Sequence, residues 1–238
     1  MEETAQPVPD PVSGVFAYLD GILRHREGYF TDIFENRRIW RHLFLLLGII
    51  VVLSGFYGLV MGASSDWRQM LASAVKIPVL YLLTVAVCYP VLYVVIVIMG
   101  SRLGFLQTLT LILLALALSS ILLASCAPIV LFFTLTGADY HFLKLLNVAI
   151  FAFGGAWGML GLWRGLTAMC ESSDLYPRQA VRILQIWALV FAFVGMQMTW
   201  SLRPFVGAPG LEFQVFRAQQ GNFYEDVWKS FSRLTKGR

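Results

Sequence analysis

The residues of this chain that could do chemistry are neutral polar side chains within long apolar segments. Ion-coupled carriers, and enzymes that act inside a membrane, place Asp, Glu or His in their spans because those groups bind and release protons and ions. Here His25, His42 and His141 flank the apolar segments, whose interiors hold no carboxylate. The sequence therefore argues against a proton-coupled carrier and against an enzyme, and it predicts no metal site and no cofactor.

Two amides stand out among the polar residues, Gln185 and Gln197, because an amide is costly to expose to lipid and should point inward. Such groups bond between helices at a gain of roughly 0.6–2 kcal/mol each. Two interpretations are open: the polar residues hold helices together, or they line a narrow pore or pocket. The candidate lining residues are Ser119, Ser120, Asn147, Gln185 and Gln197.

A second candidate site lies at the end of the last apolar segment, where Trp200 precedes Arg203 and Pro204. This stretch is typical of an interfacial anchor, with Trp200 at head-group depth and Arg203 reaching the phosphates. The alternative is that Arg203 turns inward and, with Lys144, marks a site for an anion or a lipid head group. Arg203, Lys144 and Trp200 are therefore the candidate residues of this site.

The elements that must position these residues are membrane-spanning helices. Of 238 residues, 58% are apolar and 13% charged, and the mean hydropathy is +0.70, whereas a soluble domain is roughly 45–50% apolar. We predict an all-α, polytopic helical membrane protein with about five transmembrane helices and amphipathic segments at both ends. The predicted spans are 39–61, 77–99, 104–136, 143–166 and 180–202.

The third span is the ambiguous one, because 104–136 exceeds the ~20 residues of a single crossing and is too short for two. Pro128 divides it. We predict a break near Pro128, with a kinked or re-entrant extension after it, and a continuous tilted helix is the alternative. In the second span, Pro78 suits the first helical turn and Pro90 should kink the middle.

The two ends of the chain form separate parts, residues 1–38 and 205–238, around the bundle of residues 39–204. From Val12 onward apolar residues recur at helical spacing with charges between them, and we expect a break near Gly28. This amphipathic helix is expected to lie on the membrane surface, with packing on a soluble partner as the alternative. A second, short amphipathic helix is expected in 205–238.

Glycines recur at helical spacing in two of the predicted spans. Such stripes let helix backbones approach closely, so we expect the two spans to pack tightly, either against each other or across a dimer interface. The stripes are Gly55, Gly58 and Gly62 in the first span, and Gly154, Gly158, Gly161 and Gly165 in the fourth.

The charges favour a membrane environment and one orientation in it. The net charge is +4, and the cations stand beside the apolar segments, where they contact anionic head groups, so nucleic acid is not the expected partner. Nine Lys and Arg flank the spans on the side of the N-terminus, against three in the opposite loops and six in the C-terminal tail, and the count over the loops predicts a cytoplasmic N-terminus in a bacterial inner membrane. Cys88, Cys126 and Cys170 are too scattered for a disulfide framework or a metal site.

A short motif carries a resemblance to a known family. Ser173-Asp174-Leu175-Tyr176-Pro177 is similar to the Asp-Leu-Tyr-Gly-Pro element of the Yip1 family, and a polar, proline-bearing tail before five short-looped spans resembles that family's layout. Here the motif lies between the fourth and fifth spans and lacks the glycine, so no functional residue is carried over. The resemblance implies membrane trafficking or organisation through partner binding.

Two functional hypotheses follow. The first is a non-catalytic scaffold or accessory subunit that binds membrane lipids and a membrane protein partner, or forms a homo-oligomer. The second is a passive channel or permease for small ions or solutes, lined by Ser, Thr and Gln, with the segment around Pro128 as a re-entrant element.

Overall fold

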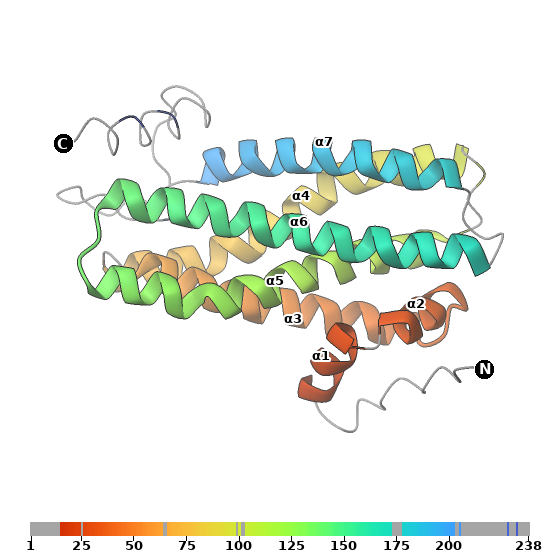
Figure 1. Ribbon diagram of the computed structural model, residues 1–238, viewed down its shortest axis with the longest axis horizontal. Helices are drawn as coiled ribbons and strands as arrows, with labels where there is room; N and C mark the ends of the chain where they lie inside the picture. The colour runs from red at the N-terminus through yellow and green to blue at the C-terminus, as the bar shows by residue number, and fades with distance from the viewer. Residues whose placement is uncertain are drawn as a thin grey trace.

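The computed structural model describes residues 15–24, 26–63, 66–98, 100, 103–172, 178–202, 205, 228 and 232, and all its regular elements are helices (Figure 1). Five helices are long and apolar enough to cross a membrane. The chain is therefore an all-α, multi-pass integral membrane protein. Apart from Phe205, Trp228 and Ser232, the segment 205–238 that was predicted to hold a second amphipathic helix lies outside the described residues. The helices are α1 (Val15–Arg24), α2 (Arg26–Phe34), α3 (Ile39–Gly62), α4 (Trp67–Ile98), α5 (Phe105–Leu135), α6 (Tyr140–Ser172) and α7 (Arg178–Leu202).

The spans form a bundle around α5. This helix packs against α3 on one side and α6 on the other, while α4 packs against α3, and α7 packs against α4 and to a smaller extent α6. Within the most apolar part of each helix, 67% of the residues of α5 are buried and only 11% of those of α7. The third span is thus the centre of the bundle, and the fifth is its most exposed member.

The start of the second span was predicted wrongly. The helix begins at Trp67, ten residues before the predicted start at residue 77, and it continues through both Pro78 and Pro90. Asp66 explains the early start, because its carboxylate accepts a hydrogen bond from the Trp67 amide at 2.7 Å and its carbonyl accepts from Gln69 and Met70. An Asp at this position stabilises the otherwise unpaired amides of a first helical turn.

The third span has no break at Pro128, so the predicted interruption is wrong and the continuous helix describes it. Pro128 is exposed on the surface of α5, so its ring is not buried against a neighbouring helix. At 1.5 Å per residue, 31 residues measure about 46 Å, well beyond the ~30 Å hydrocarbon core. The helix must therefore tilt or extend past the hydrocarbon.

The two glycine stripes face different helices, so the described chain does not pack them against each other. A Cβ on Gly62 would lie 2.7 Å from Met70 Cα on α4, and one on Gly58 2.9 Å from Ala74 Cα. On α6, Gly154 and Gly158 lie directly against Ser119, Leu123 and Ala115 of α5. The glycines bring α3 onto α4 and α6 onto α5.

The N-terminal segment forms two short helices, and Gly28 lies inside the second, so the predicted break near Gly28 is wrong. Six of its described apolar side chains are buried inside the protein, contrary to the expectation that this face lies at the acyl boundary or on a soluble partner. Gly21 lets Tyr29 lie against α1, because a Cβ there would be 3.0 Å from the Tyr29 ring. The buried residues are Tyr18, Ile22, Tyr29, Phe30, Ile33 and Phe34.

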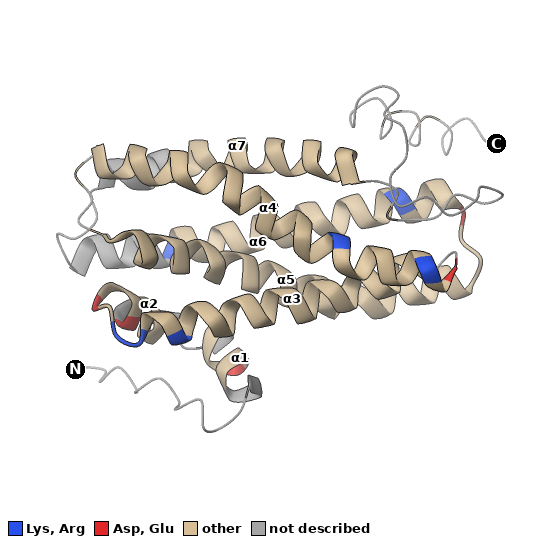
Figure 2. Cartoon of the chain, turned by 180° about the vertical axis from the view of Figure 1, so that it is seen from behind, with Lys and Arg blue, Asp and Glu red and all other residues tan. Residues whose placement is uncertain are grey.

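Charged residues gather at the two ends of the bundle, and its middle is almost free of them among the residues coloured in Figure 2. The α1–α2 pair lies at one end, where α3 and α5 begin, and the end of α7 lies at the other (Figure 1). An odd number of spans places the α1–α2 pair and the end of α7 at opposite ends of the bundle. The two ends therefore face opposite sides of the membrane.

Candidate functional site

The polar residues inside the bundle are bonded across helix contacts. The Tyr57 hydroxyl on α3 donates to Oδ1 of Asn147 on α6 at 2.6 Å, and Nδ2 of Asn147 donates to the Leu143 carbonyl at 2.7 Å. Tyr57 is completely buried and Asn147 is 2% exposed. These bonds satisfy Asn147 between two spans, where an unpaired amide would be costly.

A second pair connects α4 to α5. The Tyr81 hydroxyl lies 3.0 Å from Oγ of Ser119, within hydrogen-bonding distance, and Ser120 donates to the Leu116 carbonyl at 2.9 Å. The ring of Phe151 on α6 lies edge-on to both Tyr57 and Tyr81, with centroid distances of 5.6 and 6.3 Å. Asn147 and Ser119 therefore belong to one packed cluster, whereas Ser120 bonds within its own helix.

The two glutamines do not join that cluster. Gln185 is exposed and Gln197 is half-buried, so the expectation that both point inward is wrong for Gln185. Gln185 lies near the start of α7, where the head-group region can solvate its amide, so the cost of burying or exposing it is small. The backbone carbonyl of Gln197 accepts a hydrogen bond from Ser201 at 3.0 Å.

The predicted anion site at the end of α7 is only partly described, because Arg203 lies outside the described residues. Trp200 is 7% exposed, so its ring is held inside the bundle and not at its lipid-facing surface. Lys144 is half-buried near the start of α6.

The end of α7 is instead fastened to α4 through Phe205. The Phe205 carbonyl accepts hydrogen bonds from Oγ of Ser73 at 2.6 Å and from Nε2 of Gln69 at 3.1 Å. The ammonium of Lys76 lies 5.8 Å from the centre of the Phe205 ring, at the distance of a cation–π contact. Lys76, expected to precede the second span, is 6% exposed inside α4.

At the opposite end, a polar cluster joins α1 and α2 to the bundle. The Tyr18 hydroxyl and Nδ1 of His42 share a hydrogen bond of 2.9 Å, and Nε2 of His42 lies 3.7 Å from Oδ2 of Asp32. Tyr29 donates to the Tyr18 carbonyl at 3.2 Å. Burial, with the nearby Asp32 carboxylate, raises the pKa of Tyr29 to about 12, and burial also raises the pKa of Tyr18.

Gln107 adds a second attachment of the N-terminal pair. Its Nε2 donates to the carbonyls of Ile33 and Phe34, at 3.1 and 2.8 Å, and its Oε1 accepts from the Gly104 amide at 2.6 Å. One side chain therefore joins the end of α2 to the start of α5. Neither Gln107 nor His42 was predicted to make these contacts.

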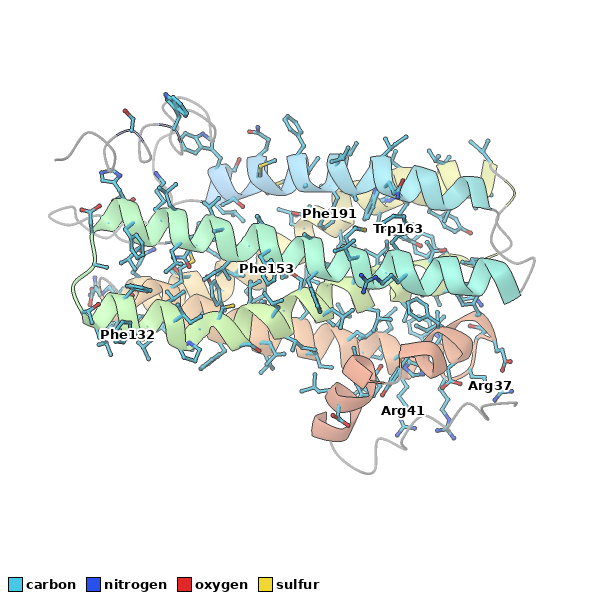
Figure 3. All side chains as sticks on the ribbon, in the orientation of Figure 1. Arg37, Arg41, Phe132, Phe153, Trp163 and Phe191 are labelled. Atoms are coloured by element: carbon cyan, nitrogen blue, oxygen red, sulfur yellow. The ribbon has the colours of Figure 1, made fainter. Side chains whose placement is uncertain are left out.

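Basic residues surround the turn between α2 and α3. Figure 3 shows Arg37 and Arg41 pointing away from the bundle. Arg37 pairs with Glu35 at 2.5 Å. Beside them is an open pocket of about 620 Å³, within the ~300–1,000 Å³ typical of ligand sites. Its lining consists of Asn36, Arg38, Ile39, Trp40, Arg41 and Leu106.

The arrangement suits binding and helix packing. Among the described residues no three His, Cys, Asp or Glu side chains gather as metal ligands would. His42 has a hydrogen-bond or ion-pair partner near each ring nitrogen, so its geometry serves the attachment of α1 and α2. The chain matches no protein-family model, and comparisons with curated proteins and with solved structures find no similar protein.

Proposed function

We propose that this protein is a non-catalytic membrane scaffold or accessory subunit that holds lipids and a membrane protein partner. The observation that carries the proposal is the pairing of its interior polar groups. Asn147 bonds Tyr57, and Ser119 bonds Tyr81, so these groups fasten α3, α4, α5 and α6 to one another. A bundle fastened in this way is a fixed frame on which partners can assemble.

The outer face of α6 is a suitable place for a partner helix. While Gly154 and Gly158 are buried against α5, Ala152, Gly155 and Ala156 are exposed on the other side. A Cβ on Gly155 would meet nothing within 4 Å. Small exposed residues let a helix from another chain, or from a second copy, approach closely.

Large apolar side chains are also exposed on α6 and on the neighbouring α7. Phe153 is 60% exposed and Trp163 is 39% exposed on α6, and Phe193 is 51% exposed on α7 (Figure 3 labels the first two). In a membrane they contact either lipid or a partner's span. In a helix–helix contact, large exposed side chains fill the grooves of the other helix, and small residues leave room for its side chains.

The alternative function, a passive channel or permease, rested on a re-entrant element around Pro128. The continuous course of α5 removes that element, and the scaffold is the reading we propose. The five-span order also accords with the resemblance to the Yip1 family, whose role would be membrane organisation.

We place the α1–α2 end in the cytoplasm of a bacterial cell, since Arg37, Arg38, Arg41 and Arg164 lie at that end.

Two measurements test this function together. The purified protein in liposomes should give no flux of ions or small solutes above protein-free liposomes. In native membranes, a photo-crosslinking amino acid at Ala156 should form a defined protein adduct, and one at Val87, which is 50% exposed on α4, should not. Solute flux, or equal adducts at both positions, would contradict the proposal.

A further inference from the structure

The turn between α2 and α3 holds its arginines in an unusual backbone conformation. Asn36 and Arg38 have φ values of 58° and 49°, in the left-handed region that non-glycine residues rarely adopt. For Asn this is common, but for Arg it is a strained conformation of the kind that concentrates at functional sites. Arg38 directly precedes α3, and Arg41 is in its first turn.

Below the pocket, the outer face of α3 is continuously apolar. Trp40 and Phe44 are 57% and 65% exposed, and their rings stack at 6.2 Å. The same face continues at four-residue spacing through Gly48, Val52 and Phe56. A Cβ on Gly48 would meet nothing within 4 Å, so the stripe has an open notch one turn below Phe44.

We propose that this junction binds an anionic phospholipid, with its phosphate group facing Arg38 and Arg41 and one acyl chain along Trp40, Phe44 and Gly48. Both arginines line the pocket together with Trp40, whose ring stacks on Phe44 at the start of the apolar stripe. The charged groups, the interfacial Trp and the apolar stripe match the three zones of a phospholipid: charged phosphate, interfacial region, hydrocarbon. Trp favours the middle of these three zones.

Two features favour a lipid over a soluble anion or an acidic peptide. The pocket is lined by Ile39 and Trp40, where the apolar face of α3 begins, so apolar and charged groups line it side by side. Leu106 of α5 forms the other wall, which adds apolar contact next to the charge. A free phosphate would contact only the arginines and would leave the exposed apolar face of α3 from Trp40 to Phe56 without a ligand contact.

The inference rests on the proposed function and names the lipid class and the place of binding. The two can fail separately, since lipid binding at α3 does not depend on partner contacts at α6.

The test is titration of the delipidated protein in detergent with phosphatidylglycerol and, separately, phosphatidylcholine, with the bound lipid counted by native mass spectrometry. The protein should bind the first phosphatidylglycerol at least fivefold more tightly than phosphatidylcholine. Arg38→Gln and Arg41→Gln should each weaken phosphatidylglycerol binding about fivefold, which is about 1 kcal/mol per basic residue at an anionic surface. The double variant should lose about 25-fold.

Arg164→Gln is the matched control. It removes the same charge from the same end of the bundle, on the exposed side of α6 and outside the pocket. It should change the affinity less than twofold. Arg41→Lys keeps the charge and should retain most of the binding. Because Arg38→Gln changes a strained turn, unfolding of each variant is measured without lipid, and Arg41→Gln carries the test if Arg38→Gln unfolds.

Three results would overturn the inference. Equal affinity for the two lipids would show that the phosphate charge is not recognised. An equal loss in Arg164→Gln would assign the effect to net charge and not to the pocket. Displacement of the lipid by 10 mM inorganic phosphate would identify a site for a free anion.

Discussion

Substituting Gly58 by alanine should force α3 away from α4. The added Cβ would lie 2.8 Å from the Ser73 carbonyl carbon and 2.9 Å from Ala74 Cα. Non-bonded carbons rest at about 3.5–4.0 Å, so the two helices would have to separate by roughly 0.6–1 Å. Both contacts are backbone atoms, which cannot rotate away as a side chain can. Overpacking of this kind costs about 1–3 kcal/mol.

Gly48→Ala is the control on the same helix, because a Cβ there would meet nothing within 4 Å. Both variants gain up to about 1 kcal/mol of helix propensity. Their difference in free energy of unfolding should therefore be about 1–3 kcal/mol, with Gly58→Ala the less stable. The assay is reversible unfolding in mixed micelles of dodecylmaltoside and increasing dodecyl sulfate. Equal stability of the two variants would refute the close approach of α3 and α4 at Gly58.

Three further predictions concern the polar contacts. Tyr57→Phe removes the donor to Asn147 and should lower the free energy of unfolding by about 0.6–2 kcal/mol in the same assay; an unchanged value would contradict the bond. Asp66→Ala removes the cap of α4 and should cost about 0.5–2 kcal/mol, with faster amide exchange confined to the first turn of α4. The pKa of Tyr29 is raised from 10 to about 12, so its stabilising contribution should be complete below pH 10 and lost as the pH rises through 12. The free energy of unfolding should fall over that range, and the fall should be smaller in Tyr29→Phe.

The number and type of the spans could be predicted, because a run of about 20 apolar residues is dictated by the membrane itself. The helix ends could not be predicted from hydropathy alone. Asp66 extends α4 upstream by capping its amides, and α6 continues to Ser172 through Glu171, beyond the last apolar residue. A helix end depends on where its amides and carbonyls find partners, and an Asp directly before Trp67 was the available signal for α4.

The candidate sites were less predictable than the fold. Asn147, Ser119 and Ser120 were recognised as residues that need partners, but their partners on other helices depend on which faces meet. Tyr57 and Tyr81 were not predicted to bond across helices because tyrosine was counted as an apolar residue, although a buried hydroxyl also needs a hydrogen-bond partner. Tyr18 and Tyr29 carried the same signal on the N-terminal helices. The arginines at 37, 38 and 41 were visible as charge, but their arrangement around Trp40 required the turn geometry.

The central position of α5 has a consequence for how the protein is made. The chain enters the membrane from its N-terminus, so α3, α4 and α5 are all present when the third span has been inserted. These three helices already contain the contacts of α3 with α4 and with α5. The last span then closes on a partner, α4, made three spans earlier, and the Phe205 carbonyl fastens it there. The packing of α7 on α4 is therefore completed by residue 205. A chain truncated before residue 205 lacks the hydrogen bonds of the Phe205 carbonyl to Ser73 and Gln69.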